Sequence, residues 1–267
     1  MSHDVPPLLQ HFDVNGACLH IFWIPALGTP ARFYRHMAQA LIDNNVAVSV
    51  MELRGHGEST SIPGRHCDFG IDDLLDDARR SLAAIMANFP DRQVIVGGHS
   101  LGGHLAMLLA AVMSEPKRVL VVAHGMPYWR FYRGWLRTKI LLLAAMINVL
   151  TPLLGYFPGH RIGFAGRESR QLMRDWCRWA LRGQYDAHYT QPLASFKGQF
   201  LAVDIDGDQI TPTYVACKTE SYLPSAKHSR TQLSLPHNAV NHHHAWAKPA
   251  HVDKVVSAML ALLESEQ

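Results

Sequence analysis

The chain has few cysteines and few charged residues. Only 18% of its residues are charged, which is low for a disordered chain. Its four cysteines, Cys18, Cys67, Cys177 and Cys217, lack the spacings of zinc sites or disulfide frameworks. Residues 1–7 lack the basic start and apolar core of a secretion signal. We therefore expect a reducing, cytoplasmic setting and no bound metal.

Acidic residues are scarce in one part of the chain. Residues 125–185 contain ten Lys/Arg and two Asp/Glu, a local charge of +8, which leaves 15 basic and 20 acidic residues elsewhere. Such an excess suits an anionic partner, which could be a lipid surface, a phosphate-bearing substrate or an acidic protein. No nucleic-acid-binding motif accompanies it, so we expect no nucleic acid as a partner.

A long uncharged run is present at 140–157, and it just reaches the length of a membrane span. Asn148, Pro152 and Gly155 disfavour a spanning helix. We expect a cap over an apolar pocket, with a segment of the core as the alternative. Trp129 and Trp135 lie just before the run, among four basic residues: Arg130, Arg133, Arg137 and Lys139. This mixture of tryptophan and basic side chains suits contact with a membrane surface.

The remaining sequence, 48% hydrophobic over 267 residues, alternates predicted strands and helices without repeats or low-complexity linkers. Asn15-Gly16 predicts a hairpin between strands at 8–14 and 17–24. Asp68 or Asp72 is expected to cap a helix that ends near 89. The other predicted strands are 46–51, 94–96, 117–123, 198–205 and 230–235, and the other predicted helices are 31–44, 101–113 and 249–263.

This alternation predicts an α/β protein with a mostly parallel sheet flanked by helices. It is interrupted between about 125 and 196, where four of the six tryptophans lie. We therefore expect a core domain made of residues 1–124 and 197–267, with a helical cap inserted at 125–196.

The most informative stretch is Gly98-His99-Ser100-Leu101-Gly102, which lies between an apolar strand and an apolar helix. It is the Gly-x-Ser-x-Gly pattern of a nucleophile elbow. A serine on so sharp a turn has a strained backbone, and side chains at the two glycine positions would clash with the strand and the helix. The turn exposes the Ser100 hydroxyl next to the helix N-terminus.

A serine hydroxyl needs a base, and the base needs an oriented partner. Asp208 follows a predicted strand by three residues, and His243 lies in a His-rich loop, 237–244, after the last strand. The carboxyl ends of parallel strands meet at one edge of the sheet, so these groups can converge on Ser100. The order Ser, Asp, His is that of α/β-hydrolases.

Several motifs together resemble the α/β-hydrolase-fold serine hydrolases. They are the elbow, Glu52-Leu-Arg-Gly-His-Gly-Glu-Ser59, Asp208-Gln-Ile-Thr-Pro212 and His243-His-Ala-Trp246. Three further segments are similar to a branch of bacterial predicted esterases, and the resemblance runs from about residue 17 to the end: Ala31-Arg-Phe-Tyr34, Gly155-Tyr-Phe-Pro-Gly159 and Arg174-Asp-Trp-Cys-Arg-Trp179.

The resemblance implies that Ser100 is the nucleophile, Asp208 the orienting acid and His243 the general base. Asp204 and Asp206 compete with Asp208 for its role, and the histidines that compete with His243 are His237, His242, His244 and His251.

The resemblance also implies an oxyanion hole. The Leu101 amide is one donor, and Leu27 is the expected second donor, with Gly28 as the alternative. Pro25-Ala26-Leu27-Gly28 stands where the family usually has His-Gly-x-Gly, and Glu52 replaces the usual Asp, a change that concerns loop bracing.

We expect a serine hydrolase that cleaves carboxylic esters of hydrophobic or lipid-like acyl groups through an acyl-enzyme, without a cofactor. Trp129, Trp135 and Trp246 are the predicted substrate-binding side chains. One alternative is a thioesterase or acyltransferase that acts on acyl-CoA or acyl-carrier-protein, which the basic cap favours. Another is a non-catalytic ligand-binding protein on the same scaffold.

Overall fold

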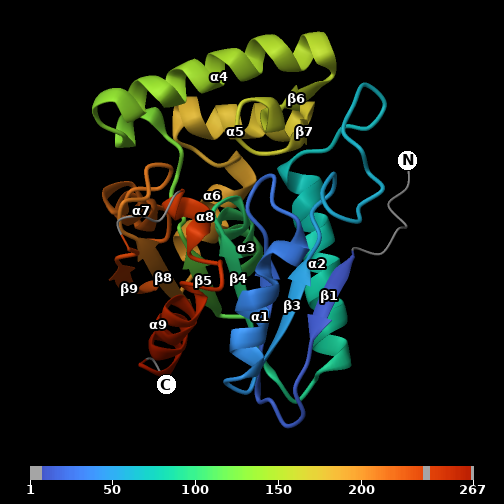
Figure 1. Ribbon diagram of the computed structural model, residues 1–267, viewed down its shortest axis with the longest axis vertical. Helices are drawn as coiled ribbons and strands as arrows, with labels where there is room; N and C mark the ends of the chain where they lie inside the picture. The colour runs from blue at the N-terminus through green and yellow to red at the C-terminus, as the bar shows by residue number, and fades with distance from the viewer. Residues whose placement is uncertain (1–7, 237–240, 266–267) are drawn as a thin grey trace.

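The computed structural model describes residues 8–236 and 241–265, and a seven-stranded sheet runs through its centre (Figure 1). The strand order is β1-β3-β2-β4-β5-β8-β9, with β1 antiparallel to β3 and every other pair parallel. The central strands are apolar because helices cover both of their faces. The strands are β1 (Leu9–Phe12), β2 (Leu19–Ile24), β3 (Val46–Met51), β4 (Gln93–His99), β5 (Arg118–Val122), β8 (Gln199–Ile205) and β9 (Lys227–Leu233).

Two layers of helices enclose the sheet. On one face α1 (Arg35–Ile42) and α9 (Val252–Glu264) share a buried cluster with the strands. On the other face lie α2 (Ile71–Asn88), α3 (Leu101–Val112) and α6 (Ala187–Ser195). The predicted fold class, a mostly parallel sheet flanked by helices, is confirmed.

A separate layer lies above the sheet's carboxyl edge and forms the top of the molecule in Figure 1. It contains α4 (Gly134–Leu154), α5 (Arg170–Arg182) and the strand pair β6 (Tyr156–Pro158) and β7 (Arg167–Ser169), and we call it the cap. Its small apolar core joins α4 to α5 and consists of Ala144, Ile147, Phe157, Met173, Trp176, Cys177 and Ala180. The later part of the insertion, α6, packs against α3 instead.

Short elements complete the chain around the carboxyl edge of the sheet. Four are 3-10 turns: η1 (Ala31–Tyr34), η2 (Trp129–Phe131), η3 (Gly159–Arg161) and η4 (Glu220–Tyr222). Two are short helices: α7 (Thr213–Thr219) and α8 (His242–Ala245).

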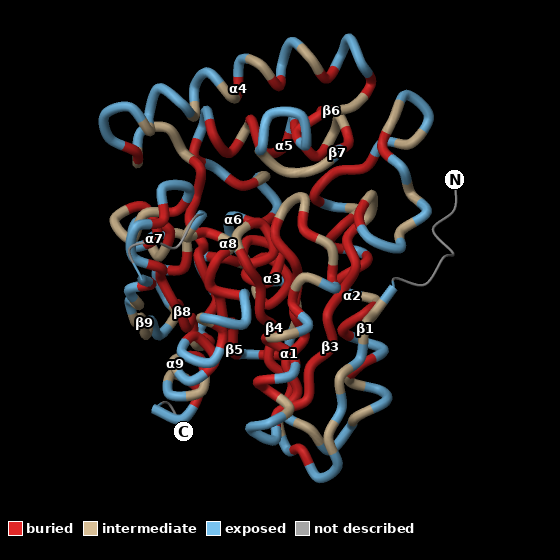
Figure 2. Tube along the Cα trace, in the orientation of Figure 1, coloured by how far each residue is buried: buried red, intermediate tan, exposed pale blue. Residues whose placement is uncertain are grey.

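By length and composition α4 could cross a membrane, with a mean hydropathy of 1.5 over its most apolar window. In this structure its inner side packs on α5, while the opposite side is exposed (Figure 2). This segment is therefore part of the cap, and Ile140 and Leu143 from it line the pocket next to Ser100.

The predicted hairpin between the first two strands is wrong, because β3 lies between β1 and β2. The turn itself forms, with Ala17 N donating to Val14 O, but only Gly16 has a positive φ, of 80°. That combination belongs to a type II turn, whereas two-residue hairpins need the opposite twist. The strands therefore diverge and pair with the two edges of β3.

The predicted cap of α2 is also wrong. Gly70 is the residue before the helix, and its N–H donates to the Asp73 carboxylate at 2.8 Å. Asp68 instead accepts from the Gln171 amide of the cap at 2.8 Å. An acidic residue does cap the helix as expected, but it is Asp73. Asp68 is engaged instead by the contact with α5.

The long loop between β3 and α2 ties the cap to the core. Arg167 Nε of β7 donates to Pro63 O at 2.7 Å, and Arg65 donates to Leu153 O at the end of α4 at 2.6 Å. The His56 ring lies 3.2 Å from a carboxylate oxygen of Glu168, and both side chains are buried. Burial opposes protonation of His56, but the hydrogen bond and charge of Glu168 outweigh it and raise the pKa of His56.

Candidate active site

Ser100 lies on a strained turn between β4 and α3, with φ 52° and ψ −114°. Close backbone contacts leave no room for side chains at the flanking glycines. A Cβ on Gly98 would lie 2.2 Å from Gly102, and a Cβ on Gly102 would lie 1.9 Å from Ile24 O. The pattern therefore has the steric basis expected of an elbow.

Asp208 and His243 meet beside this turn. His243 Nδ1 lies 2.7 Å from Asp208 Oδ2, and both side chains are buried. Three further donors hold the carboxylate: Ile210 N at 2.8 Å, Thr211 N at 3.1 Å and Thr211 Oγ1 at 2.7 Å. Because an ionised carboxylate only accepts, Nδ1 carries the proton and Nε2 is left as an acceptor.

The contacts of Asp208 also determine its charge. Burial alone would raise the pKa of Asp208, but the electrostatic interaction with His243 and hydrogen bonds from His243 and Thr211 lower it below its ordinary value. Asp208 therefore stays ionised at neutral pH and fixes the orientation of the imidazole.

The two competing carboxylates are engaged elsewhere. Asp204 lies within β8 and pairs with Arg230 at 2.5 Å. Asp206 is exposed, and its carboxylate accepts from Ser234 Oγ at 3.1 Å. Neither contacts a histidine ring in the described part of the chain.

The adjacent histidines diverge from one another. His242 Nδ1 donates to Asp206 O at 2.6 Å on the exposed side. His244 lies on the other side, with Nε2 3.4 Å from Thr29 Oγ1. His251 precedes α9, and His237 lies outside the described residues, as does the start of the predicted loop at 237–244. His243 is the one that meets Asp208.

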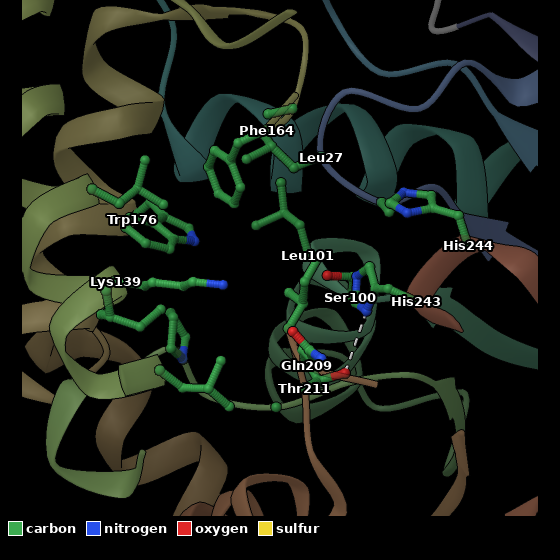
Figure 3. A pocket seen from close by; sticks show the side chains of 18 of the residues that line it. Leu27, Ser100, Leu101, Lys139, Phe164, Trp176, Gln209, Thr211, His243 and His244 are labelled. Carbon is green, nitrogen blue, oxygen red and sulfur yellow. Dashed lines mark hydrogen bonds between the residues drawn. The ribbon is translucent and has the colours of Figure 1, made fainter. Parts of the chain in front are cut away.

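The pocket next to Ser100 brings these groups together. It has a volume of about 300 Å³, and its lining includes Ser100, Leu101, Leu27, His243 and His244. The His243 ring lies 4.7 Å from the ring of His99, the residue before Ser100. Figure 3 shows the Ser100 hydroxyl beside the His243 imidazole. No hydrogen bond joins these two groups among the described residues.

Four other histidines near Ser100 are held neutral. Burial, and next the charge of neighbouring histidines, lowers the pKa of His99 and His104 well below its usual value. Burial lowers the pKa of His124 and of His244 to about 4. His99 is held by the Tyr34 hydroxyl at 2.9 Å and His104 by the Tyr185 hydroxyl at 2.5 Å, so these rings serve packing and hydrogen bonding.

Two backbone amides remain available at the pocket. The N–H groups of Leu27 and Leu101 have no hydrogen-bond acceptor within residues 8–236 and 241–265. Gly28, the alternative donor, is not among the lining residues and lies under the cap, where an added Cβ would be 2.5 Å from the backbone of Ala165. Glu52 braces this segment, because its carboxylate accepts from Ala31 N at 2.9 Å.

The predicted substrate-binding tryptophans are not brought to the pocket. Trp246 is fully buried under the site, packed against Trp23 and donating toward His99. Trp135 is 62% exposed on the outer side of α4. Trp129 donates its indole N–H to Leu181 O at 3.2 Å, outside the pocket. The expectation failed because position in the sequence does not say which side of the cap a side chain occupies.

The pocket instead uses cap residues that were not predicted from the sequence to line it. The main ones are Lys139, Ile140 and Leu143 from α4, Phe164 from the loop before β7, and Trp176 from α5. The signal for Trp176 was present: Arg170, Arg174 and Arg178 recur every four residues and mark the opposite side of α5. Trp176, which falls between them, therefore belongs to the apolar side.

No group of three or more His, Cys, Asp or Glu side chains within the described residues could hold a metal ion. All four cysteines are free thiols. The arrangement around Ser100 is one of a hydroxyl, an oriented imidazole and two amide donors, which is the set needed for acyl transfer.

Comparisons with known proteins agree with this fold. Residues 19–155, just over half of the chain, match the hydrolase family model described as serine aminopeptidase, S33. No curated protein matches the chain.

Among solved structures, a lipase-esterase related protein from Clostridium acetobutylicum is similar with a TM-score of 0.65 and 12% identity, covering 97% of this chain and 100% of that one. Est1E from Butyrivibrio proteoclasticus, solved with ferulic acid bound, has a TM-score of 0.63 and 14% identity, covering 97% and 95%. A bromoperoxidase from Bacillus anthracis has a TM-score of 0.61 and 16% identity, covering 98% and 97%. At these identities the likeness establishes the α/β-hydrolase fold.

Proposed function

This chain belongs to the hydrolase family described as serine aminopeptidase, S33, and from that premise we propose that it is a serine hydrolase that cleaves carboxylic esters through an acyl-enzyme intermediate. The observation that carries the proposal is the buried Asp208–His243 pair, 2.7 Å apart, beside a serine on a strained elbow in an apolar pocket.

In the first half of the reaction Ser100 Oγ attacks the ester carbonyl carbon and its proton passes to His243 Nε2. The carbonyl oxygen becomes an oxyanion that accepts hydrogen bonds from the amides of Leu27 and Leu101. The tetrahedral intermediate then expels the alcohol, which takes the proton from His243. Asp208 keeps Nδ1 protonated and stabilises the imidazolium.

In the second half a water molecule attacks the acyl-enzyme while His243 Nε2 accepts its proton. The same two amides hold the oxyanion, and the proton returns to Ser100 Oγ as the carboxylic acid leaves. No hydrogen bond joins Ser100 and His243 among the described residues, and catalytic contacts of this kind often tighten only when substrate binds.

The lining of the pocket favours hydrophobic acyl groups. Ile140, Leu143, Phe164 and Trp176 form an apolar wall on the cap side. An aminopeptidase substrate carries a protonated amine, which a carboxylate would bind, and no Asp or Glu is among the described residues that line the pocket. This charge pattern supports an ester over a peptide.

The test is labelling with a fluorophosphonate together with hydrolysis of 4-nitrophenyl esters of increasing acyl length. We expect labelling of the wild type and loss of kcat on the order of 10^4-fold or more in Ser100→Ala. Ser221→Ala changes an exposed serine, whose hydroxyl contacts Lys218 O, and serves as the control. Equal labelling of wild type and Ser100→Ala contradicts the proposal, as does no labelling at all.

A thioesterase or acyltransferase remains a second candidate, favoured by the basic residues at the start of α4. Arg130, Arg133 and Arg137 are exposed near the pocket and suit an anionic carrier. Faster turnover of acyl-CoA than of the matched oxygen ester, lost in high salt, would establish it. The third reading, a non-catalytic ligand-binding scaffold, requires ligand binding without any turnover.

The location of the protein is also a proposal. Four free cysteines, two of them exposed, support a reducing, cytoplasmic compartment, because exposed thiols are oxidised outside it.

A further inference from the structure

One formal charge lies on the lining of the pocket, on a side chain that is also exposed to solvent. Of the described residues that line it, Lys139 alone carries a formal charge at neutral pH, and none is an Asp or Glu. Its ammonium group has no carboxylate or carbonyl partner among the described residues. The neighbouring arginines differ, because Arg137 donates to Tyr132 O at 3.0 Å and Arg130 lies 5.2 Å from the Trp129 ring.

A second donor lies beside Lys139. Trp176 is only 8% exposed, yet its indole N–H has no acceptor within residues 8–236 and 241–265. Figure 3 shows the nitrogen ends of Lys139 and Trp176 directed into the pocket from the cap side, opposite the wall of Ser100 and Leu101. Because this N–H opens to the pocket and has no protein acceptor there, an acceptor atom of a ligand can be its partner.

We propose that Lys139 and Trp176 bind an anionic group, a carboxylate or a phosphate, at the far end of the substrate's acyl chain. The Lys139 ammonium group and the Trp176 indole N–H both donate hydrogen bonds and both point into the same apolar pocket. A carboxylate or phosphate, which only accepts hydrogen bonds, matches this pair. We assign the anion to the acyl chain because the apolar side chains that line the same pocket, Ile140, Leu143 and Phe164, suit such a chain. This inference rests on the proposed ester hydrolysis and narrows its substrate class.

The test compares three 4-nitrophenyl esters that differ only at the end of a six-carbon acyl chain. They are the hexanoate, the adipate monoester and the 6-phosphonohexanoate. We expect kcat/KM to favour one of the anionic esters by about tenfold, the range of a charge-assisted hydrogen bond that is partly screened. The better of the two identifies the anion as carboxylate or phosphate.

Variants separate the anion site from the chemistry. Lys139→Met should abolish the preference and Lys139→Glu should invert it, each measured as the ratio of kcat/KM between the anionic ester and the hexanoate. Trp176→Phe removes the N–H and should reduce the preference partially. Arg137→Met, which changes a cation outside the pocket, is the matched control and should keep it.

The outcomes distinguish the two proposals. Ser100-dependent hydrolysis without preference for either anionic ester overturns the anion site and leaves the ester hydrolase standing. If no ester is hydrolysed, calorimetry of Ser100→Ala with adipate monoamide and with hexanamide still decides: equal affinity overturns the anion site, and tighter binding of the anionic amide supports it.

A separate observation concerns the outer side of α4. Trp135, Leu142, Val149 and Leu153 recur at helical spacing there and are 62%, 58%, 59% and 64% exposed. Figure 2 shows this side of α4 as the outermost surface of the cap. No Asp or Glu occurs from 125 to 167, whereas six Lys/Arg do.

We infer that this side of α4 binds the surface of an anionic lipid bilayer. A helix with an apolar outer side, a tryptophan near one end and flanking arginines has the composition of helices that lie in the membrane interface. The inner side of the same helix lines the pocket, so docking would place the cap side of the pocket next to the lipid.

Sedimentation with vesicles tests this surface. We expect binding to vesicles of phosphatidylcholine with phosphatidylglycerol, and weaker binding to phosphatidylcholine alone. Leu142→Gln with Val149→Gln should lower the partition coefficient by at least about tenfold, and Arg130→Gln with Arg133→Gln should remove the preference for anionic lipid. Ile62→Gln, which changes an apolar side chain 65% exposed on a loop, should bind like the wild type.

Two results overturn the membrane surface. One is the absence of binding to either vesicle. The other is a vesicle-free dimer that Leu142→Gln with Val149→Gln converts to a monomer, which would assign this side of α4 to a second copy of the chain.

Discussion

The two walls of the pocket are built in different ways. The wall that carries Ser100 is made of backbone held in close contact, where Gly98, Gly102 and the end of β2 leave no free volume. The wall formed by the cap is made of side chains from α4 and α5 packed on a small core. The first wall tolerates little change in geometry, whereas the second can change side chains without disturbing the backbone. If the proposed ester hydrolysis holds, reaction type and substrate range are therefore encoded in separate parts of the chain.

The largest expected effect is on the Ser100 side. Asp208→Asn keeps the shape of the acid but permits the wrong imidazole tautomer, so we expect kcat to fall by about 10^4-fold. Esterase assays with 4-nitrophenyl hexanoate measure this. Asp206→Asn, two residues away and exposed, should retain activity within about twofold. Similar losses in both variants would show that the loop, and not the Asp208–His243 pair, is what matters.

This part of the molecule was readable from the sequence. Gly98 and Gly102 were readable once the strand and helix around them were recognised, because backbone crowding excludes larger side chains there. The nucleophilic role of Ser100 rested on the Gly-x-Ser-x-Gly pattern, with a passive serine as the alternative. The convergence of Ser100, Asp208 and His243 was expected from parallel-strand topology, and their order along the chain is that of α/β-hydrolases. Whether these residues catalyse the reaction stays a prediction that the activity assays must test.

The cap was less readable. Trp129, Trp135 and Trp246 were chosen by residue type, but only tertiary packing decides which side of a helix faces the pocket. Lys139 was assigned to a surface group, and it is exposed, but its long side chain also lines the pocket. The first hairpin failed for a related reason, since β3 offered better pairing than the local turn.

The second prediction concerns the crowding itself. Gly102→Ala places a Cβ 1.9 Å from Ile24 O. We expect a loss of about 3 kcal/mol in the free energy of unfolding, at the upper end for overpacked sites. Urea unfolding measures it. Gly64→Ala, where the nearest atom to the added Cβ is 3.7 Å away, should cost less than about 1 kcal/mol and is the control.

The third prediction contrasts neighbouring residues of α4. Leu143 lines the pocket, while Leu142 is 58% exposed on the outer side. Leu143→Ala should raise KM for 4-nitrophenyl hexanoate by about threefold to tenfold, because several buried methyl and methylene contacts are lost. Leu142→Ala should leave KM unchanged. Equal effects would mean that α4 does not form a wall of the acyl pocket.

The smallest expected effect is the pH dependence of the tie between His56 and Glu168. Because the pKa of His56 is raised in the folded state, the pair stabilises the protein fully at pH values below the pKa that His56 has in the unfolded chain. This contribution is lost as the pH rises through the pKa of His56 in the folded protein. The stability difference between wild type and His56→Gln should therefore be larger at about pH 5.5 than at about pH 8.5, by about 1 kcal/mol, the gain from charging a hydrogen bond. Urea unfolding at both pH values measures the difference. A constant or reversed difference contradicts the assignment.

The contact between Gly28 and the backbone of Ala165 joins the roof of the cavity to the turn that carries Leu27. An acyl group too bulky for the cavity would have to lift that roof, and the turn beneath would lose its support. Oversized esters should therefore still bind but react slowly, so that selection by size appears in kcat rather than in KM.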